Sequence, residues 1–207
     1  FQTTEGYWHD LLGEPGGGIE YLAEFLTQYF TIPGFSSATI ALLLGAIAGG
    51  LALFLQTAGC AHPMALALLP GLLFWFFPQE SIAPLLTVAV ACWSAVGYNS
   101  ISRWAWLRYL VGFLLLTLTY FWAAPANLLV GLFLGMAELS RREGTKSGLV
   151  AVAWLAMAAL LPFVAMRTCF VVPMREAYLS KYMCHPEYPI PSSLLAFGLA
   201  YPLTAAV

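Results

Sequence analysis

Two groups of ionisable residues border the apolar runs of this chain, and their types are suited to chemistry on a phosphate-linked group. The first group is acidic and lies in the stretch GEPGGGIEYLAEFLTQYF; it consists of Glu14, Glu20 and Glu24. The second group is basic and consists of Arg167, Arg175, Lys181 and His185. A carboxylate can act as a general base, and Arg binds phosphate oxygens well. The acids are therefore candidate catalytic residues and the cations candidate ligand-binding residues. Solvated loop charge is the simpler interpretation of both groups.

Other motifs give little chemistry. The sequence has no CxxC, HExxH, P-loop or GxGxxG pattern. Cys184, His185 and Glu187 lie close together, but their spacing fits no standard zinc site, so we expect no metal and no cofactor. A Cys169–Cys184 disulfide would be allowed in an oxidising compartment, and the sequence leaves it open.

The composition points to lipid as the solvent of this chain. Of the 207 residues, 61% are hydrophobic and 9% charged, whereas a soluble domain has roughly 25% charged residues. The mean hydropathy is +0.81. A net charge of −2 gives no reason to expect nucleic acid, so the expected partner is the lipid bilayer, and protein partners stay undetermined.

Long apolar runs that could cross a bilayer set the expected architecture. About 20 such residues make one transmembrane helix. Four complete runs cover residues 36–56, 82–99, 106–122 and 147–166, a fifth begins at 192–207, and two shorter ones cover 64–77 and 126–138. Since the runs are apolar on every face, helices are favoured over barrel strands. We expect an all-α, polytopic transmembrane bundle of about seven membrane segments over residues 36–207, preceded by an outer-face region over 1–35. The first residue is Phe and the last run stops early, so we expect both ends to be truncated.

The charge distribution predicts the orientation in the inner membrane. Arg103 and the segment from Arg141 to Lys146 lie in loops on one side, which short basic loops mark as cytoplasmic. The acid-rich residues 5–24 and the loop 167–191 then lie outside.

The outer-face region contains an expected amphipathic helix. From Ile19 onward, apolar residues recur at three- and four-residue spacing through Phe30, which predicts a helix lying at the membrane interface. We expect Phe25 and Leu26 to be buried against lipid or the bundle, and Glu20 and Glu24 to face water or a polar site. A preceding helix is expected at residues 7–12, and the glycines at 16–18 are interpreted as a hinge between the two.

Three further features bear on the bundle. Ser36 or Ser37 is expected to cap the first span, and Gly45 with Gly49 is expected to let helices approach closely. No acid or base lies near the centre of a predicted span, which disfavours an ion-coupled carrier. Pro70 interrupts the run at 64–77, as in carriers built from broken helices.

The stretches LLGEPGGGIEYLAEFLTQYFTIPGF and CFVVPMREAYLSKYMCHPEYPIP resemble an uncharacterised family of Gram-negative polytopic inner-membrane proteins. The resemblance covers essentially the whole chain, and its specific part is a PGG-x(3)-YL-x-EFLTQ-x-F pattern. That pattern matches Pro15, Gly16, Gly17, Tyr21, Leu22, Glu24, Phe25, Leu26, Thr27, Gln28 and Phe30. The resemblance implies an upstream span and a downstream helical-repeat soluble region. It implies no catalytic residue, since the family has no established activity.

Three functions remain open at this point. The mechanistic preference is a glycosyltransferase-like enzyme that uses an anionic lipid or lipid-linked substrate at a polar site on the outer face, by analogy of architecture. The alternatives are a non-enzymatic envelope scaffold that anchors a soluble repeat domain, and a carrier of an apolar or lipid substrate.

Overall fold

The part of the chain that the structure, a computed structural model, describes is entirely helical. It comprises residues 13–76, 81–101, 104–124, 126–141, 145–170 and 178, and it contains seven α-helices, one short 3₁₀-helix and no strand. The all-α prediction is confirmed. The elements are α2 (Gly17–Thr27), η1 (Gln28–Thr31), α3 (Phe35–Thr57), α4 (Pro63–Phe76), α5 (Ala83–Ser100), α6 (Ala105–Ala123), α7 (Ala126–Ser140) and α8 (Thr145–Thr168).

From α3 to α8, each helix ends within two residues of the bounds of the apolar run that predicted it. Proline and glycine explain part of this agreement, because α4 begins at Pro63 and a left-handed Gly34 (φ 83°) precedes α3. Gly34 also replaces the expected serine caps: α3 starts one residue before Ser36, and no side chain caps it. The predicted helix at 7–12 and the predicted span at 192–207 lie outside the described residues.

Three of the described helices are long and apolar enough to cross a membrane: α3, α6 and α8. Helices α4 and α7 are apolar but shorter, and α5 ends in the polar residues Tyr98, Asn99 and Ser100. The described part therefore has three candidate membrane spans, and the expected number of seven segments is not supported.

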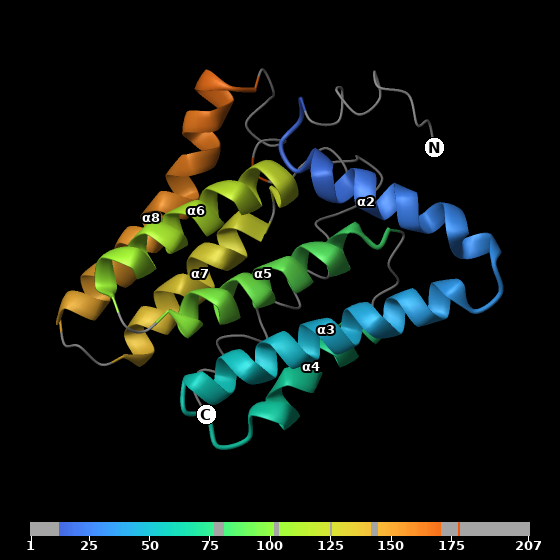
Figure 1. The fold of residues 1–207 in the computed structure, drawn as a ribbon, viewed down its shortest axis with the longest axis horizontal. Coiled ribbons are helices and arrows are strands. Elements are labelled where there is room, and N and C mark those ends of the chain that lie inside the picture. Colours follow the sequence, from blue (N-terminus) through green and yellow to red (C-terminus); the bar gives the residue numbers. More distant parts are fainter. Residues whose placement is uncertain are drawn as a thin grey trace.

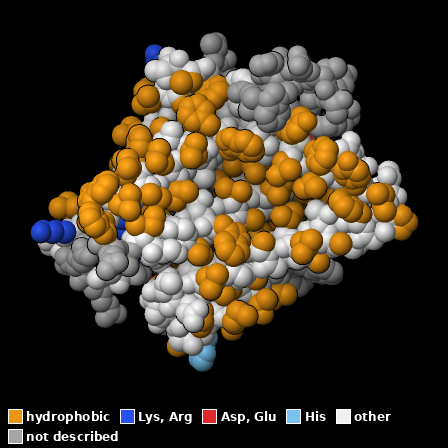
Figure 2. Space-filling model, viewed as in Figure 1, with side chains coloured by type: hydrophobic (Ala, Val, Ile, Leu, Met, Phe, Trp, Pro, Cys, Tyr) orange, Lys and Arg blue, Asp and Glu red, His pale blue; other side chains and the backbone are white. Residues whose placement is uncertain are grey.

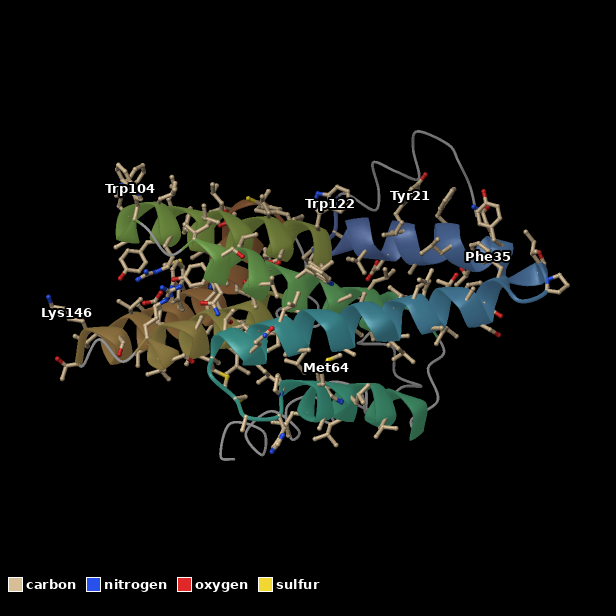
Figure 3. The ribbon with its side chains drawn as sticks, turned by 60° about the horizontal axis from the view of Figure 1, so that its bottom comes forward. Tyr21, Phe35, Met64, Trp104, Trp122 and Lys146 are labelled. Carbon is tan, nitrogen blue, oxygen red and sulfur yellow. The ribbon has the colours of Figure 1, made fainter. Side chains whose placement is uncertain are left out.

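Helix α5 lies at the centre of the bundle and contacts α3, α7, α6 and α2 (Figure 1). Helix α4 packs outside α3, and α8 packs outside α7. Successive helices run in opposite directions, so the ends of α3, α5 and α7 meet the starts of α6 and α8 at one end of the bundle (Figures 1 and 3). This arrangement brings together polar residues that are far apart in the sequence.

Small residues allow close helix packing, although not at the predicted positions. A Cβ built on Gly131 would collide with the side chain of Ala158, and one built on Gly50 would lie 3.0 Å from that of Cys92. Among the described residues, no atom beyond the neighbouring turns of α3 lies within 4 Å of a Cβ built on Gly45 or Gly49. The predicted Gly45–Gly49 packing face is therefore wrong for the described helices, because this face of α3 points away from them.

Helix α8 contains a proline whose effect is compensated by a neighbouring helix. Pro162 has no N–H, so it cannot donate the helical hydrogen bond to the carbonyl oxygen of Ala158. The Asn127 side chain on α7 donates to that oxygen instead, over 2.7 Å from Nδ2. Figure 1 shows α8 bending along its length, as expected for a proline-containing helix. Asn127 therefore satisfies a carbonyl that the bend leaves open.

The surface of the described bundle is rich in large apolar side chains. Figure 2 shows them spread over the displayed face, with Lys and Arg at its edges. Leu42, Leu149 and Val152 are among the most exposed. A soluble monomer rarely shows so continuous an apolar surface, whereas lipid requires one.

Candidate functional site

A buried carboxylate at the end of the bundle is the most polar point that the structure describes. Glu138, in the last turn of α7, is 1% exposed. Its Oε1 accepts a 2.6 Å hydrogen bond from the Tyr98 hydroxyl and lies 2.8 Å from Nε of Arg108. Its Oε2 accepts a 3.3 Å hydrogen bond from Nη2 of Arg108. The Arg108 guanidinium therefore holds both carboxylate oxygens.

Arg141 and two polar residues extend this arrangement towards the surface. The Nε of Arg141 lies 3.8 Å from Oε1 of Glu138, and its Nη2 donates to Oδ1 of Asn99 over 3.1 Å. Asn99 in turn donates to the Thr57 hydroxyl over 2.6 Å. We call this set the Glu138 network; its members are Thr57, Tyr98, Asn99, Arg108, Glu138 and Arg141. It joins the ends of α3, α5 and α7 to the start of α6.

Close packing fixes the position of the Tyr98 ring. Trp154 of α8 lies edge-on to it, with ring centroids 6.0 Å apart. A Cβ on Gly112 of α6 would lie 2.8 Å from both rings, so only glycine leaves room for them. The tyrosine hydroxyl is thereby aimed at Glu138, and α8 is tied to the same end of the bundle.

This network was not predicted from the sequence. Arg141 was expected only as a charge in a cytoplasmic loop, and no role was expected for Arg108 or Glu138. The available signal was one acid and one base, each near the end of an apolar run on the same predicted side. Ionisable residues in such runs are expected to pair and to mark functional sites.

The three candidate catalytic acids lie on or just before α2, at the opposite end of the bundle. Figure 3 shows Tyr21 and Phe35 at that end and Trp104 with Lys146 at the other. Glu14 and Glu24 are half-buried, but Glu20 is 4% exposed, so of the two surroundings expected for Glu20, water is excluded and a polar site stays a prediction. The reason is that α2 packs against α5 and α6 through its Gly17, Ile19, Glu20 and Ala23 side, while Phe25 is 36% exposed.

The glycines before α2 form a docking contact rather than a simple hinge. The N–H of Gly16 (φ 85°) donates to the carbonyl of Phe121 over 3.2 Å. A Cβ on Gly16 would lie 2.8 Å from the backbone nitrogen of Ala124, and one on Gly18 would lie 2.7 Å from the Trp122 ring. The PGGG segment therefore seats α2 on the last turn of α6.

The candidate ligand-binding cations are only partly described. Arg167 is exposed and lies over the Phe163 ring of its own helix, 5.4 Å from the ring centroid. Arg175, Lys181 and His185 lie outside the described residues, so their expected cluster with the acids stays a prediction. Cys169 is an exposed free thiol, and its suggested partner Cys184 lies outside the described residues. Within residues 13–170, gaps excluded, no three His, Cys, Asp or Glu side chains could hold a metal ion together.

Comparison with known proteins places the chain in a family without giving it a relative of known activity. No curated protein matches the chain, and no solved structure matches it. A family profile does match, and it covers residues 1–207. The chain therefore belongs to the family of unknown function DUF6057.

Proposed function

We propose that the protein is a multi-pass inner-membrane protein whose helical bundle serves as a rigid scaffold. In this proposal the Glu138 network faces the cytoplasm and α2 faces outward. The observation that carries it is the Glu138 network itself. In this network the Tyr98 hydroxyl and the guanidinium groups of Arg108 and Arg141 surround the buried carboxylate of Glu138. The network joins four helices at one end of the bundle and leaves Glu138 no room for a substrate.

Aromatic residues support the membrane position. Trp104 and Trp106 are exposed just before and at the start of α6, and Trp122 is exposed at its end. The rise from Trp104 to Trp122 is about 27 Å at 1.5 Å per residue, close to the roughly 30 Å thickness of the hydrocarbon core. Tryptophan prefers the two membrane interfaces, so α6 fits a complete span.

Charge supports the orientation. Arg108, Arg141 and Lys146 lie at the Glu138 end, and the described acids Glu14, Glu20 and Glu24 belong to the α2 end. Basic residues are retained on the cytoplasmic side of an inner membrane. The expected seven segments are part of this proposal: the shorter helices α4 and α7, α5, and the run at 192–207 would complete the bundle.

The scaffold proposal is tested by replacing the charges without removing the packing. Buried ion pairs can often be exchanged for apolar residues of similar size with little loss of stability. The double variant Arg108→Met/Glu138→Leu should therefore complement a deletion strain, in whatever envelope phenotype that strain shows, as well as the wild type does. The comparison requires equal amounts of both proteins in the membrane. Loss of rescue by a folded double variant would show that the charges act chemically.

A second candidate function is transfer of a group from a lipid-linked substrate on the outer face. The observation that favours it is the half-buried position of Glu14 and Glu24, two carboxylates that lie close in sequence at the α2 end of the bundle. A carboxylate at this depth could accept the proton of an acceptor hydroxyl, while Arg167 or Arg175 holds the lipid phosphate. The test is release of polyprenyl phosphate from a polyprenyl-phosphate sugar. Wild-type protein should release it, and Glu24→Gln should not; equal release by both would remove Glu24 from the reaction.

A further inference from the structure

The Glu138 network holds more positive than negative charge. Arg108 and Arg141 share one carboxylate, and Arg108 occupies it with two contacts of 2.8 and 3.3 Å. The Arg141 Nε is 3.8 Å away, beyond hydrogen-bond range. Among the described residues, no acid other than Glu138 lies within ion-pair distance of either guanidinium. Within the part of the chain that the structure describes, one positive charge therefore has no matching acid, and it belongs to Arg141.

Arg141 is also the charged member of the network that reaches the surface. Its side chain is 19% exposed, against 4% for Arg108 and 1% for Glu138. In the described part of the chain its guanidinium donates one hydrogen bond, to Asn99. A guanidinium has five N–H donors in a planar fork. Arg141 can therefore bind an anion from outside while its inner side stays directed at Glu138.

The position of Arg141 along the membrane normal indicates which anion it can bind. Arg141 follows the last residue of α7, at the end of the bundle where Trp104 and Trp106 are exposed. Exposed tryptophan marks the level of the phospholipid head groups. Lys146, exposed at the start of α8, adds positive charge at the same end. Basic pockets between membrane helices on the cytoplasmic side are suited to anionic head groups.

We infer that Arg141 binds the phosphate of an anionic phospholipid at the open side of the Glu138 network. The lipid phosphate adds negative charge beside Arg141, and the guanidinium fork matches two phosphate oxygens. The inference rests on the proposed function in one respect, since it requires the bundle to lie in a bilayer. It assigns a lipid site at the end of the molecule opposite to α2, away from the outer-face acids.

Thermal unfolding of the full chain in a maltoside detergent tests the site. We expect phosphatidylglycerol to raise Tm by about 5 °C at saturation, whereas phosphatidylcholine or inorganic phosphate at equal concentration changes it by less than about 1 °C. The Arg141→Gln variant should lose this rise. Arg141→Lys keeps the charge opposite Glu138 and lacks the fork, so it should fold and show less than half of the rise.

Several outcomes would overturn the inference. They are an equal rise with phosphatidylcholine, an equal rise with inorganic phosphate, and an undiminished rise in Arg141→Lys or Arg141→Gln. Arg167 is the cation proposed for a lipid phosphate on the outer face, so Arg167→Gln tests the alternative location: loss of the phosphatidylglycerol response in this variant, with the response of Arg141→Gln intact, would move the site to the outer face. Reconstitution separates the two proposals. Wild-type protein that enters neutral phosphatidylcholine vesicles but shows no preference for phosphatidylglycerol refutes only the lipid site, whereas failure to enter them refutes the membrane assignment.

Discussion

At the scale of single residues, we expect substitution of the buried Glu138 to lower the stability of the bundle strongly. Glu138→Gln removes the negative charge and leaves Arg108 buried without a counter-ion, which costs about 3–5 kcal/mol. Tyr98→Phe removes one hydrogen bond to the carboxylate and should cost about 1.5–3 kcal/mol. Thermal unfolding in detergent should therefore rank wild type above Tyr98→Phe, and Tyr98→Phe above Glu138→Gln. If Glu138→Gln unfolds at the wild-type temperature, the ion pair does not stabilise the bundle.

Contacts between individual side chains were the feature of this structure that the sequence predicted least well. Sequence places Arg108 and Glu138 at the same end of the bundle, but their contact depends on how α6 and α7 are rotated, and apolar runs without a polar face do not reveal rotation. The same limit explains Glu20. Its four-residue spacing from Glu24 suggested a water-facing stripe, yet the docked PGGG segment turns Glu20 towards α5 and α6.

At the scale of elements, the bend in α8 predicts one destabilising substitution and a second substitution that should restore the lost stability. Asn127→Leu removes the donor to the Ala158 carbonyl, and an unsatisfied buried carbonyl costs about 1–3 kcal/mol. Pro162→Ala supplies an N–H that can reach the same carbonyl within the helix. The double variant Asn127→Leu/Pro162→Ala should therefore recover most of the lost unfolding temperature. Simple addition of the two single effects in a double-mutant cycle would contradict the proposed substitution of one donor for the other.

The seating of α2 on α6 gives a second prediction at this scale. Gly16 and Gly34 both adopt a left-handed backbone conformation, so alanine at either position should cost about 1–2 kcal/mol. Of these two glycines, Gly16 also lies against another element, because its Cβ would meet the backbone of Ala124; no described residue beyond the chain neighbours lies within 4 Å of a Cβ on Gly34. Hydrogen exchange in α2 should therefore be faster in Gly16→Ala than in the Gly34→Ala control. Equal exchange in both variants would mean that the glycines act only through backbone strain.

Element positions themselves were predictable because lipid-compatible runs have a required length and clear boundaries. The run at 36–56 became α3, and the run at 126–138 became α7, with ends displaced by at most two residues. Packing partners were not predictable in this way. Many glycines in apolar helices look alike in sequence, and Gly131 packs closely where Gly45 does not, because only one of them faces a neighbouring helix.

At the scale of the whole molecule, the antiparallel course of the helices separates the charges. The Glu138 end carries Arg108, Arg141 and Lys146, and the α2 end carries the described acids outside the network. Sequence predicted this separation from loop charges alone, since charge bias acts on loops and does not depend on side-chain rotation. The same bias yields an orientation that can be measured in cells.

Single cysteines placed at the two ends of the bundle test that orientation in a background without the four native cysteines. Thr145 is exposed at the start of α8, and Thr31 is exposed at the end of η1. In intact spheroplasts, an impermeant maleimide should label Thr31→Cys and leave Thr145→Cys unlabelled until the membrane is permeabilised. Both residues are small, polar and exposed, so a difference in labelling reports their side of the membrane rather than their burial. Labelling of Thr145→Cys alone would invert the protein, placing the Glu138 network outside and the acids of α2 in the cytoplasm. Labelling of both at once would contradict a bundle that separates its two ends across a bilayer.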